Sequence, residues 1–210
     1  MFGYLYGHSY VSRLARYLRV SQHSSPFQIA NRIRVSDLCR VALKGIPGAR
    51  VHYTSHDDII NSLDEQEPIP HFVVLDLGTN DLLELGALVL ATRLFDLAEK
   101  LVASGVWRVV ICQVLHRGMG RAPCVTSFNA DVDLCNKILK TMAEGHPNIS
   151  LHPHKGVHTL PVYKWSDDGL HPHLYKYLKS VRLALQRVAL SCQVPHSFLC
   201  SHKTCACIYS

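Results

Sequence analysis

Three short polar motifs contain the residue types that acyl transfer requires. Gly7-His8-Ser9 lies near the start of the chain, Gly78-Thr79-Asn80-Asp81 closes an apolar segment, and Asp168-Gly169-Leu170-His171-Pro172 lies in the last quarter. A serine nucleophile, a histidine base with a carboxylate that orients it, and amide donors for an oxyanion are the groups that this reaction uses. The motifs together predict nucleophilic attack on a carbonyl carbon.

The nucleophile and its base are assigned from these motifs. Ser9 is expected between a strand and a helix, where the helix amides favour developing negative charge. The alternative for Ser9 is a helix cap. His171 is expected to be the general base and Asp168 its orienting carboxylate, since three residues in a turn can place both side chains on one side. Asp167 adjoins Asp168 and is the other candidate.

Two further groups are expected to form an oxyanion hole with Ser9. Gly48 ends the turn Gly45-Ile46-Pro47-Gly48, and a residue without Cβ lets its N–H approach a substrate. Gly45 is the alternative donor, while Pro47 is excluded because it has no N–H. The alternative to an oxyanion role is that both glycines only form a turn. Asn80 would donate its side-chain amide, unless it forms an Asx-turn or a helix cap. Asp81 is expected to cap the helix that follows.

This set of motifs, in this order, resembles the SGNH (GDSL-type) hydrolases over roughly residues 2–190. The resemblance implies a serine esterase that cleaves a small-molecule carboxylic ester through an acyl-enzyme on Ser9 and needs no cofactor. It also implies catalytic roles for Ser9, Asp168 and His171, and an oxyanion hole from Ser9, Gly48 and Asn80.

The chain departs from the family pattern at His8, where the usual block reads Gly-Asp-Ser. If His8 only takes the place of that Asp, His8→Asp should keep or raise esterase activity. Gly-His-Ser is also similar to domains of eukaryotic retroelement proteins. An alternative function is therefore a catalytically weak or inactive module of a mobile-element protein that acts in nucleic-acid or protein interaction.

Apolar segments that alternate with amphipathic ones predict the fold. Strands are expected at residues 2–6, 41–43, 72–77, 107–115 and 149–151, and helices at 10–19, 57–63, 84–104, 129–144 and 174–190. This alternation is typical of βαβ units around a parallel sheet, hence a three-layer α/β/α domain. The flavodoxin-like, doubly wound order 2-1-3-4-5 is expected, with ligands beyond the carboxyl ends of strands 1 and 3, where Ser9 and Asn80 lie. Residues 1–190 form the expected domain, and 191–210 a Cys-rich, disordered tail.

The composition fits a globular protein, with 48% hydrophobic and 18% charged residues. No apolar run is long enough for a membrane span, and no signal peptide is evident, so a cytoplasmic protein is expected. The first fifty residues hold eight basic side chains and one acidic one, which could contact nucleic acid or an acidic surface weakly. A solvated helix face is the alternative.

Cysteine and histidine patterns do not predict a metal site. Four cysteines are expected to be buried thiols, namely Cys39, Cys112, Cys124 and Cys135. His152-x-His154 with Asp167 lacks the spacing of a structural zinc site. His152, His154, His158 and His173 are expected on surface loops. In the tail, Cys200, Cys205 and Cys207 fit zinc binding or prenylation only loosely.

Overall fold

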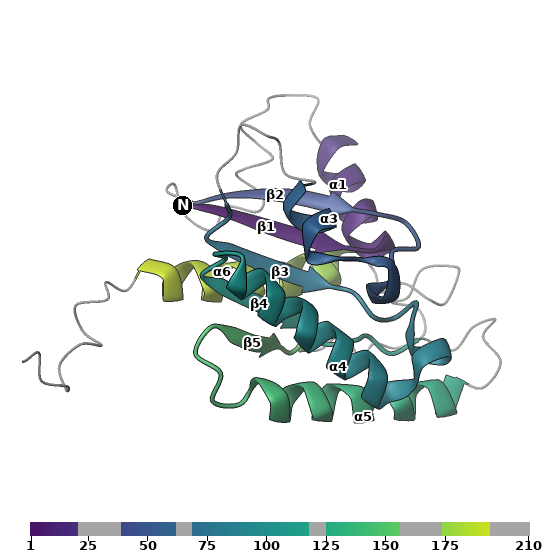
Figure 1. Ribbon diagram of the computed structural model, residues 1–210. Coiled ribbons are helices and arrows are strands. Elements are labelled where there is room, and N and C mark those ends of the chain that lie inside the picture. Colours follow the sequence, from purple (N-terminus) through teal and green to yellow (C-terminus); the bar gives the residue numbers. More distant parts are fainter. Residues whose placement is uncertain (21–38, 62–68, 118–124, 156–173, 194–210) are drawn as a thin grey trace, which may run out of the picture.

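Five parallel strands form the central sheet, in the order β2-β1-β3-β4-β5 (Figure 1). The computed structural model describes residues 1–20, 39–61, 69–117, 125–155 and 174–193. The strands are β1 (Phe2–Gly7), β2 (Arg40–Gly45), β3 (Phe72–Asp76), β4 (Arg108–Cys112) and β5 (Ile149–His152). The predicted α/β class and strand order are confirmed.

Helices cover both faces of this sheet (Figure 1). They are α1 (Ser9–Val20), α3 (His56–Asn61), α4 (Leu82–Ala103), α5 (Val125–Ala143) and α6 (Leu174–Gln193), with a short 3₁₀ turn, η1, at Val51–Tyr53. Tyr4, Tyr6 and Leu75 pack against α4 and α5 in one core cluster. Leu5, Phe72 and Val74 face α1 and α6 in the other. Because successive side chains of a strand point to opposite faces, the central strands β1, β3 and β4 supply both clusters.

The largest boundary differences from the sequence prediction lie around β4 and α5. The strand ends at Cys112 although Val114 and Leu115 are apolar and buried. Asn136 of α5 explains this, because its side chain accepts a hydrogen bond from Val114 N at 2.9 Å and donates one to Val114 O at 2.9 Å. One side-chain amide thus replaces a neighbouring strand, and the apolar run continues as a buried loop.

The end of β2 lies directly against the first turns of α1. A Cβ atom added at Gly45 would lie 2.0 Å from the backbone N of Ser12 and 2.3 Å from its Cα. Gly7, the partner of Gly45 in the β1–β2 register, is similarly confined, since its Cβ would lie 2.6 Å from Asp76 O. The two glycines therefore let α1 start close to the sheet, and Ser9 is the first residue of that helix.

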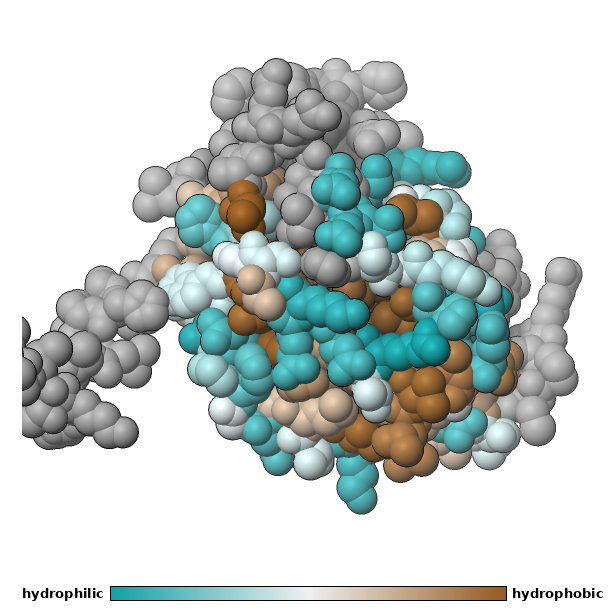
Figure 2. Space-filling view, viewed as in Figure 1, coloured by the Kyte–Doolittle hydropathy of each residue, from teal (hydrophilic) through white to brown (hydrophobic). Residues whose placement is uncertain are grey.

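Three further features concern the helices, the surface and the cysteines of the described residues. Among them, no helix combines the length and apolarity that crossing a membrane requires. On the face shown in Figure 2, apolar side chains gather along the first half of α4, where Leu83, Leu88 and Val89 are exposed.

Cys112 and Cys135 are buried free thiols as predicted, whereas Cys39 is only half-buried and Cys124 lies outside the described residues.

Candidate active site

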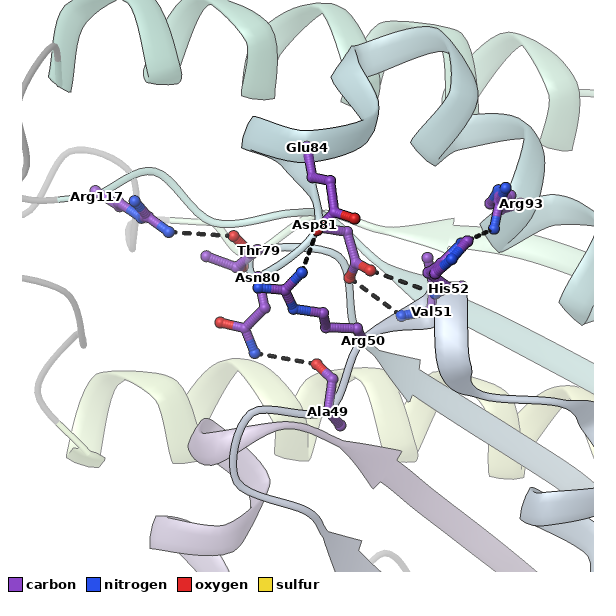
Figure 3. A network of polar contacts seen from close by, with 10 residues as sticks. All are labelled: Ala49, Arg50, Val51, His52, Thr79, Asn80, Asp81, Glu84, Arg93 and Arg117. Atoms are coloured by element: carbon purple, nitrogen blue, oxygen red, sulfur yellow. Dashed lines mark hydrogen bonds and ion pairs between the residues drawn. The ribbon is translucent and has the colours of Figure 1, made fainter.

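Three loops meet at the carboxyl edge of the sheet, one after each of β1, β2 and β3. Backbone hydrogen bonds join them: His8 N–H donates to Asp76 O at 3.2 Å, and Ile46 N–H donates to Gly7 O at 2.9 Å. Asn80 Nδ2 donates to Ala49 O at 3.0 Å, which links the loop after β3 to that after β2 (Figure 3). Ser9, Gly48 and Asn80 thus follow three adjacent strands, at the point where the strand order reverses.

Ser9 begins α1 and is half-buried. Its Oγ lies 3.3 Å from Nδ1 of His8, whose side chain is buried. The first turn of α1 follows at once, with Ser12 N–H donating to His8 O at 3.1 Å. Ser9 therefore has the strand-to-helix position that the sequence predicted for a nucleophile.

The two candidate glycines differ in their surroundings. Gly48 is exposed and has a φ of 75°, a conformation that favours glycine, with open space where a Cβ would be. Gly45 is the last residue of β2 and lies against the backbone of α1. This geometry makes Gly48 the better-placed of the two for a substrate that arrives from solvent.

Asp81 does not cap α4 through its side chain, contrary to the sequence prediction. It holds the N-cap position of that helix, but its carboxylate makes no capping bond there. Instead Oδ2 accepts from Val51 N at 3.1 Å and Oδ1 from His52 N at 3.3 Å (Figure 3). The two amides of η1 satisfy this buried carboxylate better than the helix end does. Asp81 therefore fastens the loop after β2 to the start of α4.

Charged side chains surround these loops (Figure 3). Arg50 forms an exposed ion pair with Glu84. Arg117 donates from Nη2 to Thr79 O at 3.3 Å and lies over the Phe128 ring, 4.1 Å from its centroid. Partial burial lowers the pKa of the Arg117 guanidinium, which keeps its charge because arginine stays protonated in proteins. A permanent cation thus contacts the loop that carries Asn80.

The predicted site residues that the structure describes, Ser9, Gly48 and Asn80, lie outside a surface cleft beside η1. Its volume is about 490 Å³, and it is lined by residues of η1 and by Arg93, Asp96 and Lys100 of α4. Arg93 is in close contact there with Nδ1 of His52. Ser9, Gly48 and Asn80 are not among its lining residues, so the chemistry that the motifs predict belongs to the strand ends and not to this cleft.

A buried carboxyl group lies next to His8. Asp76, the last residue of β3, is buried and accepts a close hydrogen bond from the hydroxyl of Tyr177 on α6. Its Oδ1 lies 4.0 Å from Nε2 of His8. Burial raises the pKa of the Asp76 carboxyl to about 6, and the Tyr177 hydrogen bond partly opposes that shift. Burial and the neighbouring carboxylate raise the pKa of Tyr177 well above its usual value, so its hydroxyl remains a donor.

His152 and His154 are buried, and their predicted position on surface loops is wrong. His152 ends β5, and both rings contact Ser180 Oγ of α6, at 3.3 Å from His152 Nε2 and 2.8 Å from His154 Nδ1. Burial, with the nearby Arg187 charge, lowers the pKa of His152 to about 4. Both histidines pack against α6, and the Ser180 hydroxyl contacts one ring nitrogen of each.

The predicted base and its orienting carboxylate, His171 and Asp168, lie outside the described residues, as do Asp167, His158 and His173. Sequence reasoning missed Asp76 and Tyr177 as neighbours of the site. For Asp76 a signal existed, since it is a lone carboxyl inside an apolar strand that helices cover on both faces. Tyr177 offered none, because a tyrosine on an amphipathic helix is most often an ordinary core residue.

The titration of Asp76 should be visible in the stability of the protein. Its folded pKa of about 6 lies above the value of an unfolded chain, so the unfolded state ionises first and the fold loses stability as pH rises from about 4 to 6. Asp76→Asn keeps an acceptor for Tyr177 but does not titrate. Between about pH 4 and pH 7.5, we expect the free energy of unfolding of Asp76→Asn to rise by roughly 2 kcal/mol relative to that of the native chain. Urea unfolding at both pH values measures this. An equal change in the free energy of unfolding between the two pH values in both proteins would contradict a titrating Asp76. His152 is present in both proteins, so its contribution cancels in the comparison.

Known structures share this fold, although no family model and no curated protein sequence matches the chain. A putative platelet activating factor from Streptococcus pneumonia is 16% identical, with a TM-score of 0.64 over 87% of this chain and 83% of that one. A lipolytic protein of the G-D-S-L family from Veillonella parvula is 17% identical, with a TM-score of 0.60 over 88% and 96%. A putative arylesterase from Agrobacterium tumefaciens is 14% identical, with a TM-score of 0.63 over 90% and 98%. At these identities the likeness establishes a shared α/β fold.

Proposed function

We propose that the chain is a serine hydrolase that cleaves carboxylic esters through an acyl-enzyme on Ser9. The observation that carries the proposal is the meeting of Ser9, Gly48 and Asn80 at three adjacent strand ends that hydrogen bonds join. Structures of the same fold include proteins described as lipolytic and as an arylesterase. The motif Asp168-x-x-His171 supplies the residue types for the base and its orienting group.

The reaction follows from these groups. His171 takes the hydroxyl proton of Ser9 as Oγ attacks the ester carbon, and Asp168 stabilises the imidazolium that forms. The tetrahedral oxyanion accepts hydrogen bonds from the backbone N–H groups of Ser9 and Gly48 and from the Asn80 amide. Collapse expels the alcohol, which His171 protonates. Water then attacks the acyl-enzyme with His171 again as base, and the acid leaves with Ser9 regenerated.

Asn80 can serve two purposes in this scheme. Its Nδ2 already donates one hydrogen to Ala49 O. A side-chain amide nitrogen carries two hydrogens, so this bond leaves the second for an oxyanion. The bond to Ala49 would then fix the direction of that second donor, which is the preorganisation that oxyanion stabilisation requires.

A fluorophosphonate probe tests the proposal most directly. The native chain should become labelled and Ser9→Ala should not, because only a serine hydroxyl with a base beside it attacks phosphorus at a useful rate. Labelled protein is measured by mass spectrometry, and Ser12→Ala, one turn further along α1, is the matched control. Equal labelling of the native chain and Ser9→Ala would exclude Ser9 as the nucleophile.

A catalytically weak or inactive module that acts in nucleic-acid or protein interaction is the second candidate function. Arg13 and Arg16 are exposed on α1, which fits contact with an acidic surface. A native chain that fails to label, yet binds single-stranded RNA with an affinity that falls steeply with salt, would favour this candidate.

A further inference from the structure

The residue before the nucleophile is a buried histidine that contacts the nucleophile. His8 is only 1% exposed, and its Nδ1 lies 3.3 Å from Ser9 Oγ. Its backbone N–H donates to Asp76 O, which fixes the chain at this position. Solvent therefore hardly reaches the ring. A role in holding the Ser9 hydroxyl agrees with this burial.

Groups from several elements surround the His8 ring. Asp76 Oδ1 of β3 lies 4.0 Å from Nε2, and Tyr177 of α6 donates its hydroxyl to the same carboxyl group. The Tyr10 ring of α1 packs on the imidazole with centroids 4.4 Å apart, and Tyr10 and Tyr177 also pack together at 5.5 Å. The ring thus lies between a pair of packed tyrosines and a carboxyl group. This packing sets the orientation of the ring.

We propose that His8 is a positioning residue for Ser9: its Nδ1 holds Oγ in one rotamer while Tyr10 packs against the ring and Asp76 lies beside Nε2. The proposal rests on the proposed function, and it assigns a role to the residue at which the chain departs from Gly-Asp-Ser. A serine side chain has three staggered rotamers, and only one can aim Oγ at a bound carbonyl. A contact at Nδ1 that selects this rotamer raises the fraction of molecules ready to react.

The position of Nδ1 in the side chain allows a matched pair of variants. Asn places a polar atom where His has Nδ1, while Gln places its amide further out, near the position of Nε2. His8→Asn therefore keeps the contact to Ser9, and His8→Gln loses it while it can still reach toward Asp76. Both variants introduce the same amide group. Asn is preferable to Asp here because a second carboxyl group would lie close to the buried Asp76.

The first measurement is the rate at which the fluorophosphonate probe labels each protein. We expect His8→Asn to label at close to the native rate and His8→Gln to label roughly tenfold more slowly, the effect of one net hydrogen bond. Thermal unfolding of the two variants should be similar, which separates positioning from loss of packing. If the two variants label at the same rate, whether native or reduced, Nδ1 does not position Ser9 and the proposal is wrong.

The second measurement does not depend on activity. The ¹⁵N resonances of His8, assigned by their absence from His8→Asn, should change at Nδ1 in Ser9→Ala and change less at Nε2. Ser12→Ala should leave both unchanged. A native chain that does not label, but whose His8 Nδ1 responds to Ser9→Ala, would contradict the proposed function and still support the contact. An unresponsive Nδ1 would overturn the positioning role whatever the activity.

Discussion

His171→Ala should lower kcat for a short p-nitrophenyl ester by at least ~10³-fold. This substitution removes the proposed base that accepts the Ser9 hydroxyl proton during attack. Asp168→Asn should cost less, because it disturbs the orientation of the base and leaves the base in place. Initial rates at saturating substrate measure both effects.

Asp167→Asn is the matched control, since it changes the adjacent acidic residue in the same way. We expect it to keep near-native activity, and far-ultraviolet circular dichroism should show that all three variants are folded. A His171→Ala protein with most of the native kcat would mean that Asp168-x-x-His171 is structural. The general base would then have to be found among other residues.

Gly45→Ala should reduce the free energy of unfolding by about 3 kcal/mol or more. The added Cβ would lie 2.0 Å from Ser12 N and 2.3 Å from Ser12 Cα, and backbone atoms cannot move aside as a flexible side chain can. The helix α1 must shift away from β2, and Ser9 would move with it. Denaturant unfolding measures the loss, and labelling of Ser9 by the fluorophosphonate should fall in the fraction that still folds.

Gly145→Ala is the control for this substitution. Gly145 has a φ of 82° and open space around the Cβ position, so only the left-handed conformation opposes a side chain. That conformation costs about 1 kcal/mol, roughly a third of the effect at Gly45. Comparable losses in the two variants would show that α1 and β2 are not packed as closely as described.

The sheet could be predicted from the sequence because its signals are local. Each strand is a short apolar segment between turn residues, and the alternation with helices restricts the topology to few choices. The same rule placed Ser9 and Asn80 beyond adjacent strands. The end of β4 could not be predicted, because Asn136 pairs with Val114, twenty-two residues away, and no local pattern encodes that hydrogen bond.

The detailed contacts of the site were also beyond the sequence. Asp81 matched a helix cap by its place before α4, yet its carboxylate bonds to amides about thirty residues earlier in the chain. His152 and His154 were predicted on surface loops, whereas both rings are buried and contact Ser180 of α6. In each instance the hydrogen-bond partner comes from a distant element of the chain, so composition and spacing cannot predict it.

The attachment of the loop after β2 has a consequence for how this edge of the protein can vary. Asn80 holds Ala49, and Asp81 holds Val51 and His52, while Ile46 is held by Gly7. Pro47 and Gly48 are thus a two-residue bridge between fixed supports. Because the residues on both sides are held, an inserted residue would change the direction of the Gly48 amide itself. The length of this bridge, rather than any side chain on it, sets where that amide points.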